Sequence, residues 1–327
     1  MYESSFAKEI NMYIELRSSC MSYKTVILDK AVLLDFDKYL TRNKIVSHTL
    51  DEEILTDLIN TFSGKSQTRQ SKIGVIRSFT KYLKMLGYQV FIPSSIRVKS
   101  DYIPYIFSEE EIKKILAYAD NIPVSARGTG FLHLKIPMAL RILSSCGTRL
   151  GETMALKRKD IDFKNSTIFL RETKFSKERC IPIHESLLLI LEKYCLAIGI
   201  MNKPDAFLFS GKDENSHYAG RNLSYHFSEI LKKLNIDQIE SDSYRRGACI
   251  HCLRHFYVLK AIKQLEKANH PIDTNDLILP TYLGHTHMID TDQYMRFSGV
   301  QVPESLQMFE SYTHNIIPIV EDFYEEN

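Results

Sequence analysis

A stretch rich in proline and serine interrupts the helical pattern about one third of the way along the chain. Residues 92–107 read IPSSIRVKSDYIPYIF, with two prolines, three serines and no helical period. Proline and the residue before it disfavour helix, so the stretch predicts an extended connection. A new helix is expected to begin after Ser108, a typical N-cap followed by three glutamates. For a chain of 327 residues, this break predicts two domains.

The part before the break has the pattern of a small helical bundle. Phe6–Ser18 and Lys24–Tyr39 read as amphipathic helices. Residues 59–100 contain eight lysines or arginines and no acid, and their apolar residues recur at three- and four-residue steps. A helix face of one charge sign suggests a phosphate-bearing partner, while a solvated surface helix is an equal alternative. The residues expected to contact DNA here are Lys65, Arg69, Lys72, Arg77 and Lys81.

We therefore assign residues 1–98 to a helical domain, 99–107 to a linker and 108–327 to a second domain with a C-terminal tail. The second domain mixes helices with a little sheet. Ser166–Thr173 and Arg179–His184 alternate like the strands of a hairpin. Helices are expected at Leu134–Ser145, Glu185–Ile198, Gly220–Leu234 and Ala248–Leu265. The predicted fold class is mainly α with a small β-sheet.

Four short segments carry side chains suited to phosphodiester chemistry. In C-G-T-R-L-G-E, Arg149 lies near an expected helix start, and Glu152 follows on the same face, where it can hold the guanidinium. When these two residues are taken alone, an ordinary surface ion pair is the favoured explanation. The other three segments are the turn T-K-F-S-K-E-R, with Lys174 and Lys177; H-C-L-R-H, with His251 and Arg254; and L-G-H to T-D-Q-Y, with His285 and Tyr294.

Together these side chains suit phosphodiester transesterification without metal. Two guanidiniums can bind the two non-bridging oxygens of a phosphate and stabilise its transition state. A lysine can protonate the departing oxygen, and a histidine can move the tyrosine proton. Because the pKa of tyrosine is ordinarily about 10, the nucleophile needs such a cationic pocket near neutral pH.

The order and context of the segments resemble the tyrosine recombinase (phage integrase) family over nearly the whole chain. Thr68–Leu83 is similar to that family's helical, SAM-like core-binding domain, and the similarity to its catalytic domain runs from about Ser108 to Tyr312. The resemblance implies that Tyr294 is the nucleophile. It also implies that Glu152 is the acid that supports Arg149. It implies the remaining catalytic set Arg149, Lys174, His251, Arg254 and His285, and hairpin contacts to DNA from Lys177 and Arg179.

The resemblance further implies site-specific recombination through a 3′-phosphotyrosine link and a Holliday junction. The partners it implies are double-stranded DNA carrying a recombination site and three further copies of the chain, forming a homo-tetramer on two duplexes. The type expected is the simple, Xer-like, two-domain recombinase without an arm-binding domain, and no cofactor is expected. Integration, excision, transposition, inversion and dimer resolution all stay open, as do the target sequence, the crossover spacing and any accessory proteins.

Several alternatives stand beside this interpretation. Lys177 rivals Lys174, and Tyr312 rivals Tyr294 but lacks the nine-residue spacing from L-G-H. Cys249 and Cys252, with nearby histidines, suggest zinc, but a second C-x-x-C pair is missing. A catalytically inactive DNA-binding protein or a topoisomerase-like enzyme of the same fold are the competing functions.

Three features of the sequence bear on location and assembly. No apolar run approaches the ~20 residues that span a bilayer. The acid-containing N-terminus does not resemble a signal peptide, and six cysteines are sparse for a disulfide scaffold. We expect a cytoplasmic, nucleoid-associated protein. After Arg296 the chain has acids and no lysine or arginine, so this tail is expected to pack on protein, either its own domain or a neighbour.

Overall fold

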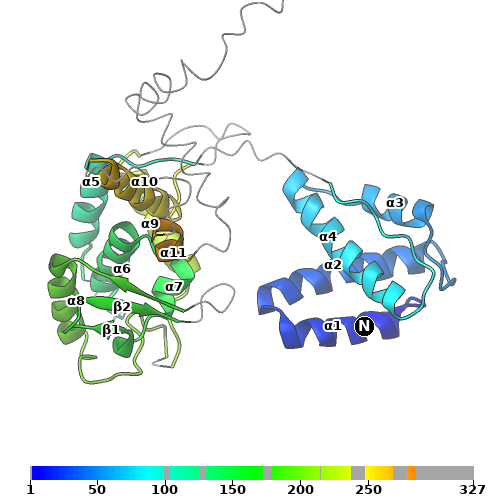
Figure 1. Ribbon diagram of the computed structural model, residues 1–327, viewed down its shortest axis with the longest axis horizontal. Helices are drawn as coiled ribbons and strands as arrows, with labels where there is room; N and C mark the ends of the chain where they lie inside the picture. Colours follow the sequence, from blue (N-terminus) through cyan, green and yellow to red (C-terminus); the bar gives the residue numbers. More distant parts are fainter. Residues whose placement is uncertain are drawn as a thin grey trace, which may run out of the picture. The chain divides into compact units, whose positions relative to one another are not determined.

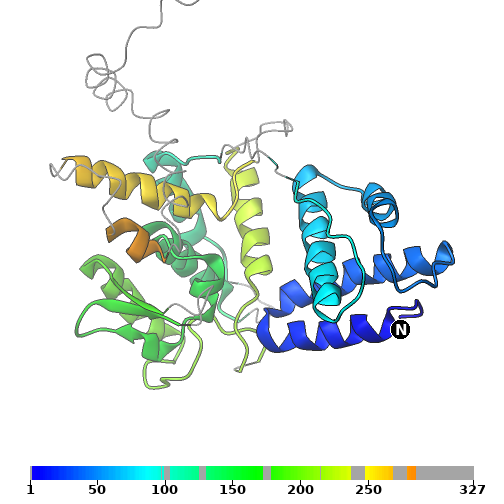
Figure 2. The same ribbon diagram turned by 45° about the vertical axis from the view of Figure 1, so that its right-hand side comes forward.

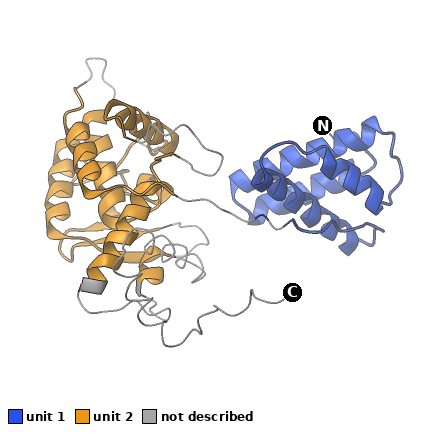
Figure 3. Cartoon of the chain, turned by 90° about the horizontal axis from the view of Figure 1, so that it is seen from above, with its two compact units in different colours: residues 1–101 blue, residues 102–327 orange. Residues whose placement is uncertain are grey.

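The computed structural model describes residues 2–96, 98, 104–124, 130–171, 178–213, 215–236, 247–267 and 278–284. The chain separates into two compact units, residues 1–101 and 102–327, which are coloured separately in Figure 3. Phe107, at the end of the expected linker, is only 3% exposed and packs in the core of the second unit. The domain limits placed at residues 98 and 108 stay predictions, because residues 99–103 lie outside the described part of the chain.

The first unit is helical, as its pattern predicts. Its described elements are α1 (Ala7–Cys20), α2 (Tyr23–Arg42), α3 (Glu52–Asn60) and α4 (Ser66–Met85), labelled in Figure 1. Ser22 accepts the Thr25 N–H and so caps α2, and Asp51 does the same for α3 through the Ile54 N–H. Apolar side chains from the helices meet in one buried core, so most of the stability of this unit comes from packing.

The second unit combines helices with a three-stranded sheet in its described part. Its elements are α5 (Glu109–Asp120), α6 (Leu132–Cys146), α7 (Leu150–Ala155), the 3₁₀ turn η1 (Arg158–Asp160), β1 (Ile161–Asp162), β2 (Thr167–Leu170), β3 (Arg179–Pro182), α8 (Glu185–Ala197), α9 (Gly220–Lys233), α10 (Cys252–Lys267) and α11 (Ile278–Leu283). The predicted N-cap of α5 is confirmed, because Ser108 and Glu111 form a reciprocal capping box. The mainly α fold class with a small sheet is also confirmed.

The sheet is antiparallel and carries the predicted hairpin strands. β2 lies between β1 and β3, with Ile168 opposite Ile181 and Leu170 opposite Arg179. Ile168, Leu170 and Ile181 are buried, so one face of the sheet contributes to the core. This register determines which side chain β3 presents next to Leu170, and that side chain is Arg179.

Helix α6 runs through the middle of the second unit and packs against α5, α7, α8 and α10. Figures 1 and 2 show the sheet at one end of this unit and helices α5 and α10 at the other. Five successive residues of α6, from Ile136 to Leu140, are buried. Because α6 is held on so many sides, the turn at its carboxyl end is a rigid place from which to present side chains.

Helix α10 begins later than its sequence pattern predicts. The expected helix began at Ala248, whereas α10 begins at Cys252. The preceding residues form a tighter turn, in which the N–H groups of Cys252, Leu253 and Arg254 each donate to the carbonyl three residues earlier. Cys249 and His251 therefore lie before the helix. No helix within the described ranges is long and apolar enough to cross a membrane.

Replacing Gly147 with alanine is expected to destabilise the protein by about 2–4 kcal/mol, because two costs combine. Gly147 ends α6 with a φ of +58°, a left-handed conformation that strains any residue with a Cβ. The added Cβ would also overlap the ring of Tyr257. Gly199→Ala is the matched control, since φ is +73° there but no atom lies within 4 Å of the added carbon. Urea unfolding should show a clearly larger loss for Gly147→Ala, and equal losses would contradict the contact with Tyr257.

Candidate active site

The first part of the site is the turn between α6 and α7. After Gly147, the chain places Arg149 at the N-cap of α7. Glu152 accepts a hydrogen bond from the Arg149 backbone N–H at 2.9 Å and from its Nη1 at 2.8 Å. The Glu152 side chain is 5% exposed and that of Arg149 is 26% exposed. Glu152 therefore supports Arg149 as predicted. The pair is a buried carboxylate that orients a partly exposed guanidinium, and not a surface ion pair.

Arg254 is the second arginine of the site and is only 2% exposed. It comes from the first turn of α10. Its Nη1 donates to the Gly147 carbonyl at 2.7 Å, and its Nη2 donates to the Leu283 carbonyl at 2.8 Å. These bonds join α10 to the α6–α7 turn and to the carboxyl end of α11. Residues 107 positions apart in sequence thus lie within hydrogen-bond distance.

Three arginines converge on the carboxyl end of α11. Arg179 Nε donates to the Tyr282 carbonyl, Arg254 Nη2 to the Leu283 carbonyl and Arg149 Nη2 to the Gly284 carbonyl. The last carbonyls of a helix have no partner within the helix and carry partial negative charge, so guanidiniums stabilise them well. The next residue is His285, which lies outside the described part of the chain.

His251 lies in the turn before α10, on an exposed surface. Burial on its inner side, together with the guanidiniums of Arg254 and Arg149, lowers the pKa of its imidazole. Both predicted arginines therefore lie near this histidine. A neutral imidazole at physiological pH can accept or pass on a proton. His255 is 7% exposed, and its ring meets that of His251 edge to face with the ring centroids 4.9 Å apart.

Stability is expected to fall as the pH drops below about 6.5, in part because of His255. Burial, with His251 and Arg254 nearby, lowers the pKa of His255 to about 3. Its neutral form therefore stabilises the fold fully above the unfolded-state pKa, and that contribution is lost as the pH falls towards the folded-state value. The expected slope is about 1.4 kcal/mol per pH unit in this window. Urea unfolding at several pH values should give a shallower slope for His255→Phe; identical slopes would contradict the assignment, and NMR titration of the His255 ring checks it directly.

The structure brings together four of the predicted site residues, namely Arg149, Glu152, His251 and Arg254. It also brings Arg179, predicted as a DNA contact, into this cluster: its guanidinium forms an ion pair with Glu152 at 2.8 Å, and its side chain is 10% exposed. Sequence spacing gave no sign of this pair. The predicted residues Lys174, Lys177, His285 and Tyr294, and the rival Tyr312, lie outside the described residues, so their roles stay predictions.

Buried hydrogen bonds keep Glu152 charged. Burial alone would raise the pKa of its carboxyl, but the hydrogen bonds and charges of Arg179 and Arg149 outweigh that effect and hold the pKa below its ordinary value. One carboxylate thus faces two guanidiniums, and Arg254 lies close by. The cluster has an excess of positive charge, which suits an anionic phosphate.

The predicted DNA-contacting residues of the first unit lie along α4. Lys65 and Lys81 are exposed, while Arg69, Lys72 and Arg77 are partly exposed. Lys72 places its Nζ over the Phe62 ring at 5.4 Å, which orders its stem without removing its charge. The opposite face of α4 is buried through Ile73, Ile76 and Phe79. The helix therefore has the one-sided distribution of charge that the sequence predicts, and contact with DNA stays a prediction.

The two cysteines considered for zinc lie close together, with their Sγ atoms 3.6 Å apart. Cys252 is buried at the start of α10, and Cys249 is exposed in the preceding turn. Among the residues that the structure describes, no group of three or more histidines, cysteines or acids is placed to hold a metal. His285 and His287 are outside those residues, so zinc stays an alternative hypothesis that metal analysis of the purified protein would test.

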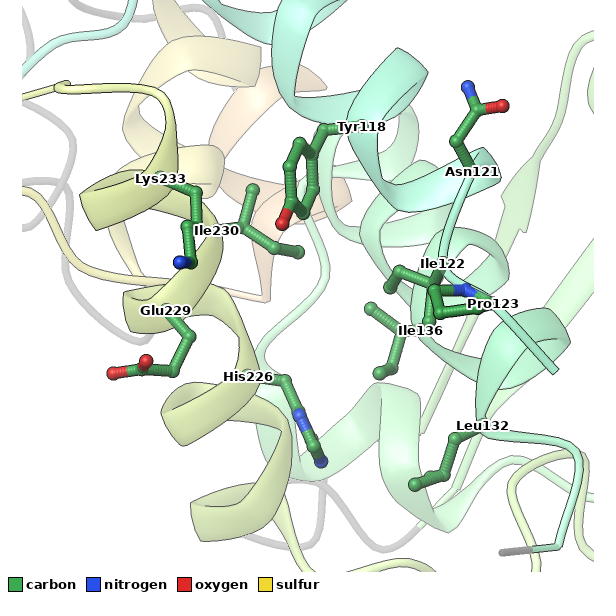
Figure 4. A pocket seen from close by; sticks show the side chains of 10 residues that line it. All are labelled: Tyr118, Asn121, Ile122, Pro123, Leu132, Ile136, His226, Glu229, Ile230 and Lys233. Carbon is green, nitrogen blue, oxygen red and sulfur yellow. The ribbon is translucent and has the colours of Figure 1, made fainter. Parts of the chain in front are cut away.

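A groove between α5, α6 and α9 lies apart from this cluster (Figure 4). Its lining is largely apolar and includes Tyr118, Ile122, Leu132, Ile136 and Ile230. His226 also faces it, and burial lowers the pKa of that imidazole. None of Arg149, Glu152, His251 and Arg254 lines the groove, so it is not the centre of the chemistry.

With this geometry in place, the family is clear: the chain belongs to the phage integrase family, whose model matches residues 106–270. It is a tyrosine recombinase-type enzyme by that membership. Among its relatives is y4rB of Sinorhizobium fredii, which carries a provisional integrase/recombinase name. It is 26% identical over 323 residues, covering 94% of this chain and 98% of y4rB. Tyrosine recombinase XerD of Rickettsia conorii is 24% identical over 265 residues, covering 76% of this chain and 86% of that protein.

The fold agrees with that of solved recombinases. The XerH site-specific recombinase bound to its difH substrate, in a pre-cleavage complex, superposes with a TM-score of 0.65 at 17% identity. The match covers 95% of this chain and 98% of XerH. The residues outside the described ranges include the segment in which the sequence places the nucleophile, so the catalytic assignment there depends on the motif alone.

Proposed function

We propose that this protein is a site-specific DNA recombinase that cuts and rejoins DNA through a 3′-phosphotyrosine link. The observation that carries the proposal is the convergence of Arg149 and Arg254 on the carboxyl end of α11, with His251 in the turn that leads into Arg254. Two guanidiniums that come from different elements and are held by buried contacts form a preorganised site for a phosphate. The chain positions that follow α11 supply His285 and, nine residues later, Tyr294.

The proposed reaction begins with attack by the Tyr294 phenolate oxygen on the scissile phosphorus. The bond from phosphorus to the 5′-oxygen breaks, and that oxygen takes a proton from Lys174. Arg149 and Arg254 bind the two non-bridging oxygens, with Glu152 orienting Arg149, while His251 and His285 manage the tyrosine proton. The covalent link conserves the bond energy, so the reverse attack by a 5′-hydroxyl needs neither ATP nor another cofactor.

Exchange between duplexes requires more than one copy of the protein. Each copy would cut one strand, and the 5′-hydroxyl of the partner duplex would attack the phosphotyrosine to form a Holliday junction. We propose a homo-tetramer on two duplexes, with basic residues of α4, and Lys177 on the hairpin, gripping the phosphates. The XerH and lambda integrase structures are those of recombinases bound to DNA sites, and this is the precedent for DNA as the partner.

Covalent trapping tests the proposal. Supercoiled plasmid carrying the DNA that flanks this gene would be incubated with the protein and a metal chelator, then quenched in detergent. The expected product is a protein–DNA adduct whose DNA is joined through its 3′ end, and mass spectrometry of the digested adduct identifies the linked residue. If a DNA pool selected for binding is also cut without any adduct, phosphotyrosine chemistry is excluded and a hydrolytic activity takes its place.

A further inference from the structure

The geometry points to Arg179 as a positioning residue that holds the Glu152–Arg149 pair and the carboxyl end of α11 in one arrangement. The inference rests on the proposed function and deepens it, because the sequence motifs name only Glu152 as a support for Arg149. Arg179 begins β3, on the strand that follows the turn carrying Lys174. It therefore belongs to the same hairpin as the proposed general acid.

The contact between Arg179 and Glu152 uses both Nη atoms of the guanidinium and both oxygens of the carboxylate. Arg179 Nη2 donates to Glu152 Oε2 at 2.8 Å, and its Nη1 donates to Oε1 at 3.2 Å. Oε1 also accepts from Arg149 Nη1 at 2.8 Å. Glu152 is thus held between two guanidiniums, and its Oε1 is shared by both. A forked pair of this kind fixes the plane of the carboxylate, and that plane in turn fixes the direction of Arg149.

Arg179 has a third donor, and it reaches a different element. Its Nε donates to the Tyr282 carbonyl at 2.8 Å, beside the carbonyls bound by Arg254 and Arg149. Gly284 makes room for the guanidinium, because a Cβ there would lie 2.8 Å from Arg179 Nη1. One side chain therefore joins β3, α7 and α11, elements whose contacting residues lie 27 and 103 positions apart in sequence.

These contacts argue against a direct grip on DNA, which the sequence assigns to Arg179. Its Nη1 and Nη2 form a forked ion pair with the buried Glu152 carboxylate and its Nε donates to the Tyr282 carbonyl, whereas the Nη atoms of Arg254 donate to uncharged carbonyls. Turning it towards a phosphate would leave the buried Glu152 with one partner fewer, and breaking a buried pair is costly. Its effect on catalysis is therefore through Arg149 and through the segment that leads into His285.

Arg179→Met tests the inference, since methionine removes the donors and keeps an extended side chain. Single-turnover cleavage at the identified site is expected to slow about 10–100-fold at saturating protein, because a misplaced catalytic group costs rate. The Kd for DNA and its dependence on salt should stay within two-fold. Arg179→Lys should recover part of the rate, because an ammonium can bind Glu152 without reproducing the fork.

The matched control is Arg171→Met, at the end of the neighbouring strand. Arg171 also pairs with a buried carboxylate, that of Asp160, at 2.6 Å, but it does not contact Glu152 in the described structure. Its loss removes an ion pair to a buried carboxylate beside the same sheet, from an arginine whose own side chain is 46% exposed. The expected cleavage rate of Arg171→Met equals that of the wild type. An equal slowing in both variants would overturn the positioning role in favour of general sheet stability.

A readout without DNA separates this inference from the proposed function. Hydrogen exchange should rise in peptides covering 149–155 and 278–284 in Arg179→Met, and not in Arg171→Met, relative to wild type. If the wild type forms no adduct on any DNA, the proposed function fails while the exchange result still decides the positioning role. A different result would make Arg179 a phosphate contact instead. In that case DNA affinity would weaken and the slope of its salt dependence would fall by about one, while hydrogen exchange and the cleavage rate at saturating protein stayed unchanged. Unchanged exchange with an unchanged rate would overturn the inference as well.

Discussion

Tyr294→Phe is expected to abolish the covalent protein–DNA adduct and to leave DNA affinity unchanged. The phenolic oxygen is the proposed attacking atom, and phenylalanine keeps the ring while removing it. In other covalent catalysts, loss of the nucleophile costs on the order of 10⁶-fold in rate, so the adduct should fall below detection. Detergent-quenched trapping on gels measures the adduct, and a filter-binding titration under the same salt conditions measures affinity.

Tyr312→Phe is the matched control, because Tyr312 is the rival nucleophile in S-Y-T-H and lies 18 residues after Tyr294. It should form adduct at the wild-type rate. An adduct that persists in Tyr294→Phe and vanishes in Tyr312→Phe would move the nucleophile to Tyr312. It would also mean that the nine-residue spacing from L-G-H to the tyrosine does not identify the nucleophile in this chain.

The parts of the site that sequence predicts are those whose partners are close along the chain. Glu152 follows Arg149 by three residues, and the structure places the pair in contact. Ser108 was predicted as an N-cap from the glutamates that follow it, and the structure shows that cap, with Glu111 completing a capping box. The hairpin strands followed from alternation, since Ile168 and Leu170 face the core as predicted. Local spacing is decisive in these cases because the geometry of one turn or one strand determines which side chains come into contact.

The parts that sequence misses depend on tertiary contacts. Arg179 reaches Glu152 only because the sheet brings β3 beside α7, and no local spacing encodes that approach. The tight turn before α10 was also missed, because apolar and small residues from Ala248 onward fit a helical period equally well. The three consecutive carbonyls that bind the three arginines are backbone groups, which carry no side-chain signal. The one hint available was the glycine at position 284, where the guanidinium of Arg179 comes close.

Arg254→Ala is expected to slow single-turnover cleavage about 10²–10³-fold, or 3–4 kcal/mol, as for the loss of one preorganised oxyanion donor. It should also lower stability, because the Gly147 and Leu283 carbonyls each lose a charged donor in a buried place. Cleavage therefore has to be measured where the variant is folded, with circular dichroism on the same samples. Arg141→Ala is the control, since Arg141 forms a two-pronged pair with Asp120 at 2.7 and 2.6 Å on α6, away from the cluster.

The rate of Arg141→Ala should match the wild type, and a slowed rate would show that loss of any partly buried arginine has the same effect.

Combining Arg254→Ala with Arg149→Ala tests whether the two arginines act on one phosphate. If both stabilise the same transition state, the double variant should lose less than the sum of the single losses, because the first loss already prevents most of the catalysis that the second supports. Fully additive losses would place the two guanidiniums on separate steps. An adduct formed at the normal rate by Arg254→Ala would remove that arginine from the catalytic set, and the carbonyls of Gly147 and Leu283 would then be its whole role.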